Sequence, residues 1–263
     1  MGAVPVSYVV DGPPDAPPLL LSSSLGATAD MWEPQLALAD RFRIVRYDHR
    51  GHGRSPVPPG RYELADLGAD ALALLDRLEI DKAHLAGLSL GGMVAMWVAA
   101  HAPDRVGRLV LMSTSAKLGP PQAWAERAAA VRAGGTGAVA ATVVGRWFTP
   151  EYASAHPEVV GRFRDMIAAS PPDGYAACCG AIERMDLEPE LAGIRAATLV
   201  IAGSDDPATP PVHAERIAAG IGGATLEMLP GTAHLANVSA ADTVNALLAA
   251  FLSPLAGTAG ASL

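Results

Sequence analysis

Short apolar runs alternate with helical patterns along the first half of this chain, and few folds are compatible with that order. Strand-length apolar runs that end at turn or small residues occupy residues 19–23, 43–48, 83–88 and 108–113. Residues 64–80 carry leucines at helical spacing, and residues 91–100 form a second helical pattern that Pro103 ends. Repetition of strand, helix and strand predicts an α/β fold with a mostly parallel central sheet flanked by helices.

The alternation stops after Ser113 and resumes near residue 197. Most of the intervening stretch is alanine-rich and helical in pattern, and strand-like runs return at residues 197–203 and 224–231 before a last helix at 241–252. We therefore expect a core formed by residues 1–116 and 191–263, with a helical cap, or lid, inserted at 117–190. Residues 4–12 alternate like an exposed strand, and the last ten or so residues are expected to form a loose tail.

Composition excludes several classes of protein. A net charge of −8 without Lys/Arg clusters argues against a nucleic-acid partner. No apolar run approaches the roughly 18 to 20 residues of a membrane helix, and the N-terminus has no export-signal pattern. The two cysteines are adjacent, so they cannot form an ordinary disulfide, and a reducing cytoplasm is the simplest location. No cluster has metal-ligand spacing, so neither a metal nor a cofactor is expected. Homo-oligomerisation is compatible with the sequence.

The stretch Gly87-Leu88-Ser89-Leu90-Gly91 lies between a predicted strand and a predicted helix. A strand that reverses into a helix within about two residues needs small neighbours, and it lifts the central serine to the edge of the sheet. In a glycine-rich chain the same string also occurs in ordinary turns. Its position between strand and helix favours Ser89 as a nucleophile.

A serine nucleophile needs a base, and the base needs an orienting carboxylate. In this architecture the expected chain order is Ser, acid and His, each after a strand. Asp206 follows the strand at 197–203, and His234 follows the strand at 224–231. Asp205 is the alternative acid.

Two backbone amides are expected to stabilise the oxyanion, those of Leu90 and of Leu25 in the serine-rich loop after residues 19–21. The other histidines are assigned structural roles: two are expected to brace their own DHRGHGRS turn, and the rest to lie in strands or near helices. They are His49, His52, His84, His101, His156 and His213.

The chain resembles the α/β-hydrolase fold family, and within it the 3-oxoadipate enol-lactonases. The resemblance extends over nearly the whole chain and is carried by LSSSLGATADMW, YDHRGHGRSP, GLSLGGM, GRWFTPEY, GYAACCGAIERMDL, GSDDPATPP and GTAHLANVS. The serine-rich loop and the GYAACCGAI segment point to the lactonases, although Ser23 stands where their pattern has asparagine. Motif by motif, the resemblance implies a catalytic triad of Ser89, Asp206 and His234.

The resemblance further implies hydrolysis of 3-oxoadipate enol-lactone to 3-oxoadipate in the catabolism of aromatic compounds. That substrate carries a carboxylate, which an acidic chain must bind with a local cation, preferably a guanidinium. Arg146 in the predicted cap is the candidate, with Trp147 and Trp124 as pocket walls. Arginine and tryptophan on such helices also simply pack or face solvent.

Two other functions are compatible with the same motifs. One is a carboxylesterase or a C–C bond hydrolase of ring-cleavage products on this fold, which would differ in the cap and pocket. The other is a ligand-binding protein of this fold without turnover, for which an incomplete triad would be evidence. A dehalogenase or epoxide hydrolase requires an aspartate nucleophile at this turn, and Ser89 argues against both functions.

Overall fold

The computed structural model describes residues 2–252, and the predicted tail lies outside the described residues. Within them the strands form a seven-stranded sheet in the order β1-β3-β2-β4-β5-β6-β7. The bounds are β1 Tyr8–Asp11, β2 Pro18–Ser22, β3 Arg43–Tyr47, β4 Ala83–Leu88, β5 Val106–Met112, β6 Ala197–Gly203 and β7 Thr225–Leu229. All neighbouring strands run parallel except β1, which pairs antiparallel with β3. The predicted exposed N-terminal strand is thus the antiparallel edge strand.

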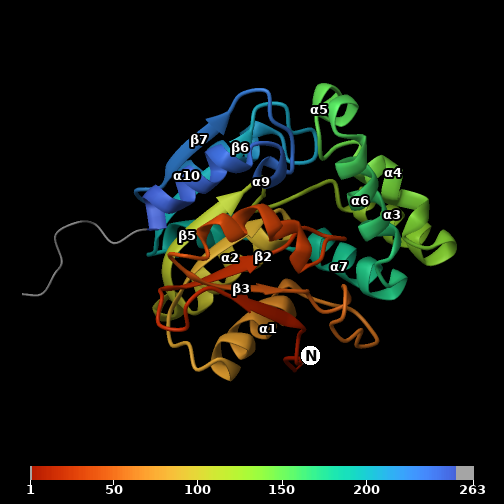
Figure 1. Ribbon diagram of the computed structural model, residues 1–263. Helices are drawn as coiled ribbons and strands as arrows, with labels where there is room; N and C mark the ends of the chain where they lie inside the picture. The colour runs from red at the N-terminus through yellow and green to blue at the C-terminus, as the bar shows by residue number, and fades with distance from the viewer. Residues whose placement is uncertain (1, 253–263) are drawn as a thin grey trace, which may run out of the picture.

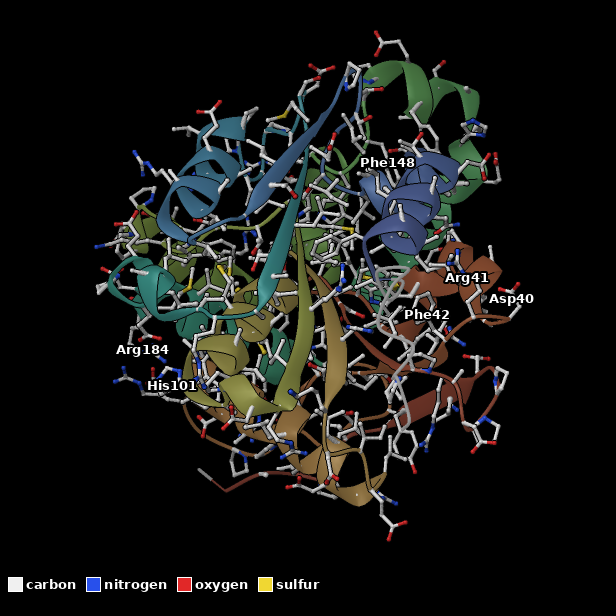
Figure 2. All side chains as sticks on the ribbon, turned by 90° about the vertical axis from the view of Figure 1, so that its left-hand side faces the viewer. Asp40, Arg41, Phe42, His101, Phe148 and Arg184 are labelled. Carbon is white, nitrogen blue, oxygen red and sulfur yellow. The ribbon has the colours of Figure 1, made fainter. Side chains whose placement is uncertain are left out.

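Helices cover both faces of the sheet, as the alternation predicted (Figures 1 and 2). The helices between or after core strands are α1 Leu64–Arg77, α2 Leu90–His101, α8 Pro211–Gly220, α9 Ala236–Ser239 and α10 Ala241–Leu252. The segment around Met31, after β2, forms a 3₁₀ helix, η1 Ala29–Leu38, which contains Pro34. A proline removes one backbone donor and disfavours a regular α-helix at this point.

The segment between β5 and β6 is helical, as its composition predicted. It contains α3 Pro121–Gly134, α4 Gly137–Val144, α5 Pro150–Ala155, α6 Pro157–Ala168, α7 Pro172–Arg184 and the short 3₁₀ helix η3 Glu188–Gly193. Figure 1 shows α3 to α7 gathered at one end of the sheet, beyond the carboxyl ends of the parallel strands. Cys178 and Cys179 lie buried in α7 as free thiols, and burial raises the pKa of Cys179 to about 12.

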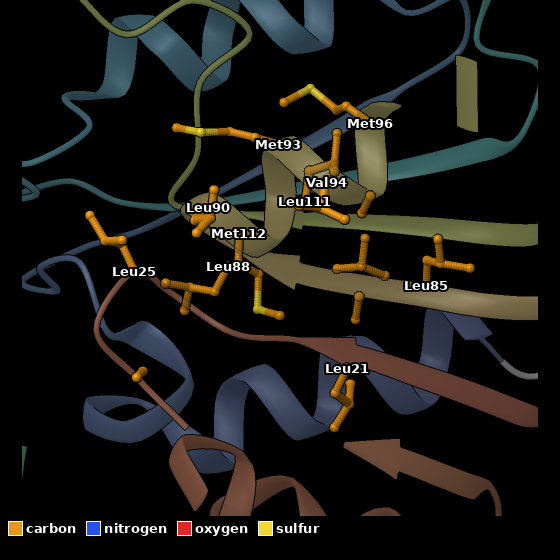
Figure 3. Packing of buried hydrophobic residues seen from close by; sticks show 14 of the residues in the cluster. Leu21, Leu25, Leu85, Leu88, Leu90, Met93, Val94, Met96, Leu111 and Met112 are labelled. Carbon is orange, nitrogen blue, oxygen red and sulfur yellow. The ribbon is translucent and has the colours of Figure 1, made fainter. Parts of the chain in front are cut away.

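The hydrophobic core is continuous from the sheet into the start of α2. Leucine and methionine side chains gather where β4 ends and α2 begins, with Leu88, Leu90 and Met112 among them (Figure 3). This packing fixes the turn at Ser89 from below. No helix among residues 2–252 is long and apolar enough to cross a membrane.

Candidate active site

Ser89 lies at the turn between β4 and α2 in a strained backbone conformation. Its φ of 56° and ψ of −117° lie in a region that side-chain-bearing residues rarely adopt. Its N–H donates to the Met112 carbonyl at 3.0 Å. A Cβ atom on Gly87 would lie 2.2 Å from the Gly91 backbone, and one on Gly91 would lie 1.9 Å from the Ser22 backbone. The turn therefore needs both glycines, as the nucleophile interpretation predicts.

Asp206 and His234 form a buried pair in the loops after β6 and β7. The His234 Nδ1 atom lies 2.8 Å from Asp206 Oδ2, and both side chains are at most 2% exposed. Because an ionised carboxylate only accepts hydrogen bonds, the proton of His234 sits on Nδ1 and the lone pair on Nε2. That is the tautomer a general base requires.

The same carboxylate accepts from the Thr209 hydroxyl at 2.7 Å and from the amides of Ala208 and Thr209. Burial alone would raise the pKa of Asp206, but the adjacent His234 ring and the Thr209 donors hold it below its ordinary value. Asp205, by contrast, is exposed, and its side chain accepts from the Ser204 hydroxyl at 3.1 Å. The structure therefore pairs His234 with Asp206 and not with Asp205.

The loop from Ser22 to Gly26 follows β2 and lies beside Ser89. Its Ser23 hydroxyl accepts from the Trp32 indole N–H and donates to the Thr28 carbonyl, both at 3.2 Å. In the described chain, the amides of residues 24 and 26–29 all have acceptors within the protein, whereas no such acceptor faces the Leu25 amide. The Leu25 N–H is thus available to a ligand. The Leu90 N–H is also available, because it lies in the first turn of α2, where amides have no intrahelical acceptor.

His49 and His52 are both buried and reach this loop in addition to their own turn. His52 Nε2 lies 2.8 Å from the Gly26 nitrogen, and His49 Nε2 lies 3.0 Å from the Ser23 carbonyl oxygen. The sequence interpretation limited their bracing to the DHRGHGRS turn. The longer reach depends on the pairing of β2 with β3, which places the two loops side by side.

Acidification should weaken the fold through these histidines. Burial and the neighbouring His52 lower the pKa of His49 from 6.5 to about 3. Between these values the unfolded chain binds a proton at this ring and the folded chain does not. The contribution of this ring to the free energy of unfolding is therefore fully present only above about pH 6.5. It falls as the pH decreases, by about 2 kcal/mol between pH 7 and pH 5. Burial also lowers the pKa of His52, which adds to the loss.

Urea unfolding at pH 7 and pH 5 measures this loss, and His49→Gln is the matched control. The variant should show a smaller difference between the two pH values than the wild type. An identical difference in both proteins would contradict the assignment to His49.

A cavity of about 360 Å³ lies between the loops of the core and the inserted helices. Ser89, His234 and Leu25 line it from the core. The predicted substrate-binding residues also line it: Trp124, Arg146 and Trp147. Arg146 is exposed and lies at the rim, whereas Trp147 is buried. Residues distant in sequence thus meet in one cavity, whereas Leu90 is buried and is not among the residues that line it.

Residues that the sequence did not assign to the site also line the cavity, and three of them bear on its chemistry: Arg127, Tyr175 and His213. Arg127 is half-buried, and its guanidinium stacks on Trp124 with 4.5 Å to the ring centre. Arg127 and Trp124 are three residues apart in a predicted helix, so the sequence already placed them on the same face of that helix. Tyr175 lies in the GYAACCGAI segment, and its buried hydroxyl makes no hydrogen bond of ordinary geometry in the described chain; burial raises its pKa, although the nearby Arg127 guanidinium acts to lower that pKa. His213, assigned a structural role, reaches the cavity while its Nδ1 contacts Ser115 Oγ at 2.8 Å.

Among residues 2–252, no group of three His, Cys, Asp or Glu side chains is placed to hold a metal ion. No Asp or Glu of the described chain lines the cavity either. Its charged side chains are therefore Arg127 and Arg146, in a protein whose net charge is −8.

Comparison with known proteins places this chain in a family. The profile of the alpha/beta hydrolase fold matches residues 17–241. The 3-oxoadipate enol-lactonase 2 of Acinetobacter baylyi is 39% identical over 243 residues, which cover 92% of this chain and 91% of that protein. The crystal structure of the enol-lactonase from Burkholderia xenovorans superposes with a TM-score of 0.93 at 39% identity, covering 95% of this chain and 96% of that one. A hydrolase structure from Pseudomonas aeruginosa has a TM-score of 0.91 at 47% identity, covering 95% and 94%. The chain therefore belongs to the α/β-hydrolase family and is similar to its 3-oxoadipate enol-lactonases.

Proposed function

We propose that this protein is a serine hydrolase that opens a small enol-lactone bearing a carboxylate, converting 3-oxoadipate enol-lactone and water to 3-oxoadipate in aromatic catabolism. The observation that carries the proposal is the composition of the cavity. One space contains Ser89, a His234 whose Nδ1 is paired with Asp206, and two arginines without a carboxylate partner in the described chain. The similarity to enol-lactonases supports the same substrate.

In the proposed acylation step these groups act together. Ser89 Oγ attacks the lactone carbonyl carbon while His234 Nε2 accepts the hydroxyl proton. The amides of Leu25 and Leu90 donate to the oxyanion of the tetrahedral intermediate. When the intermediate collapses, the ring C–O bond breaks, and the enolate oxygen leaves with the proton from His234. An enolate is a better leaving group than a simple alkoxide because its charge is delocalised.

Deacylation uses the same groups a second time. His234 takes a proton from water, the water oxygen attacks the acyl-enzyme carbonyl, and the ester bond to Ser89 breaks with return of the proton to Oγ. The released enol becomes the ketone. Asp206 remains ionised throughout and stabilises the protonated ring of His234. In this proposal α3 to α7 act as the cap that closes the cavity over the lactone.

The proposal is tested by following loss of the freshly prepared enol-lactone in the ultraviolet, with phenyl acetate as a neutral comparison ester. We expect turnover of the lactone with a much larger kcat/KM than for phenyl acetate. If the protein hydrolysed phenyl acetate but not the lactone, the serine mechanism would stand and the proposed substrate would be wrong. That result would favour the carboxylesterase alternative. Turnover of neither ester would favour the binding-protein alternative.

Removing the cavity arginines should weaken lactone binding in an order set by their burial. A charge-assisted hydrogen bond contributes about 1.5–3 kcal/mol, whereas an exposed ion pair contributes about 1 kcal/mol or less. We therefore expect Arg127→Met to raise KM for the lactone about 10- to 100-fold and Arg146→Met about 2- to 5-fold. Neither should change KM for phenyl acetate, which has no carboxylate.

Arg132→Met is the matched control for these variants. Arg132 lies on α3 like Arg127 but does not line the cavity. Its KM for the lactone should equal that of the wild type. If Arg127→Met and Arg146→Met raised KM for the lactone and phenyl acetate equally, the arginines would not bind the carboxylate.

A further inference from the structure

His49 and His52 contact the Ser22–Gly26 loop with the same ring nitrogen but in opposite senses. The Gly26 N–H can only donate, so the Nε2 atom of His52, 2.8 Å away, must carry a lone pair. The proton of His52 then lies on Nδ1, which faces the Arg50 carbonyl at 3.3 Å. The Ser23 carbonyl can only accept, so His49 must carry its proton on Nε2, 3.0 Å away. The contacts thus fix both tautomers.

These two contacts fix the peptide groups on either side of one amide. His49 holds the carbonyl of the Ser23–Ser24 peptide, and His52 holds the N–H of the Leu25–Gly26 peptide. The peptide between them contains the Leu25 N–H, which has no acceptor in the described chain. If Gly26 were not bound to His52, two successive amides would be free to turn toward a ligand.

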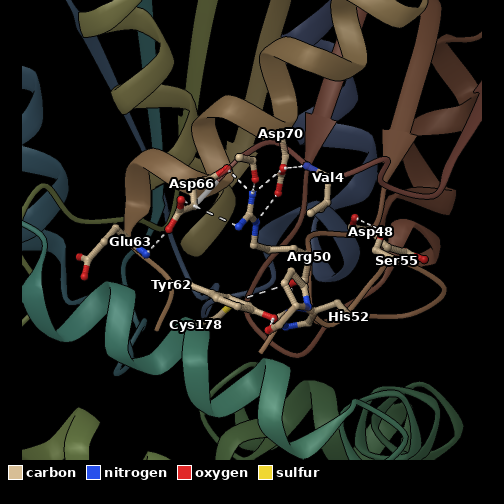
Figure 4. Close-up of polar contacts among 12 residues, drawn as sticks. Val4, Asp48, Arg50, His52, Ser55, Tyr62, Glu63, Asp66, Asp70 and Cys178 are labelled. Carbon is tan, nitrogen blue, oxygen red and sulfur yellow. Dashed lines mark hydrogen bonds and ion pairs between the residues drawn. The ribbon is translucent and has the colours of Figure 1, made fainter. Parts of the chain in front are cut away.

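Buried polar contacts hold the turn that carries the two histidines. Arg50, between them, is buried and donates from Nε and Nη2 to the Asp70 carboxylate at 2.5 and 2.7 Å (Figure 4). Asp48 accepts from the Ala29 amide at 2.8 Å, so the same turn also holds the start of η1, just after the Ser22–Gly26 loop. Neither histidine lines the cavity. They act on the substrate only through the loop.

We propose that His49 and His52 are positioning residues that aim the Leu25 amide at the transition-state oxyanion. This inference rests on the proposed serine mechanism but not on the identity of the lactone. It assigns a function to the histidines of the DHRGHGRS turn beyond support of that turn. Because the Leu25 amide stabilises charge that develops only in the transition state, its misalignment lowers kcat and leaves ground-state binding unchanged.

The test compares His52→Leu with His52→Gln on phenyl acetate, with His101→Leu as a surface control. Leucine removes the acceptor for Gly26, whereas the glutamine carbonyl replaces it. We expect His52→Leu to lower kcat about 100-fold with KM within about 2-fold, and His52→Gln to recover most of that loss. A phenylboronic acid, which forms a tetrahedral adduct with a nucleophilic serine, should lose affinity for His52→Leu by a similar factor. A folded His52→Leu with wild-type kcat would overturn the inference.

Nuclear magnetic resonance of the wild-type protein tests the same inference without a buried substitution. The imidazole ¹⁵N signals should show an unprotonated Nε2 in His52 and a protonated Nε2 in His49. Formation of the boronate adduct should move the Leu25 amide proton downfield and leave that of Gly26 in place. The reverse tautomers, or an unmoved Leu25 signal in an adduct that forms, would refute it. Absence of both phenyl acetate hydrolysis and adduct formation in the wild type would instead refute the proposed function.

Discussion

Replacement of Ser89 by alanine is expected to lower kcat for the lactone by about 10³-fold or more, because the reaction then lacks its nucleophile. The substitution removes one oxygen atom and keeps a Cβ atom in the same strained turn, so the fold should persist. Loss of lactone absorbance measures the rate, and circular dichroism and thermal melting confirm the fold. Residual activity would come from the Leu25 and Leu90 amides and His234 acting on bound substrate and water.

Ser113→Ala is the matched control for this variant. Ser113 also has a positive φ, 39°, and is buried at the end of the neighbouring strand β5, but it does not line the cavity. Its replacement should leave kcat within about 3-fold of the wild type, as expected for a residue outside the reacting groups. Retention of more than a tenth of the activity in Ser89→Ala would mean that another group attacks the lactone.

The fold was predictable because its signals are local. Each core strand is an apolar run ended by turn residues, and each core helix is a periodic pattern. The strand-to-helix position of Ser89 and the strand ends before Asp206 and His234 are also local features. The parallel sheet then brings the carboxyl ends of its strands to one edge, so residues far apart in the sequence come close together.

The contacts that sequence reasoning missed depend on pairings between distant segments. His52 binds Gly26 because β2 lies beside β3, and nothing near His52 indicates that partner. Arg127 reaches the cavity because α3 packs on α7, which also brings in Tyr175. Periodicity gives a helix its faces but does not say which face another helix will cover. The contacts around the predicted site therefore could not be predicted from the sequence and are known only from the structure.

Asp206→Asn should lower kcat for the lactone by about 10³- to 10⁴-fold, while Asp205→Asn should leave it within about 3-fold. Asparagine has nearly the same shape as aspartate, so the amides of Ala208 and Thr209 still find an oxygen acceptor. It has no charge to stabilise a protonated His234, and its amide can also donate to Nδ1. When the asparagine amide donates to Nδ1, the proton of His234 must move to Nε2. A general base needs the lone pair of that nitrogen.

The adjacent pair makes this a sharp comparison. Both substitutions remove one negative charge, one residue apart, so a general effect of charge on an anionic substrate appears equally in both variants. Only Asp206 contacts His234, at 2.8 Å, so only its variant changes the tautomer. The rates come from the lactone assay, and urea unfolding checks that Asp206→Asn remains folded. Equal losses of kcat in the two variants would show that Asp206 acts through its charge alone, and the triad would need a different third member.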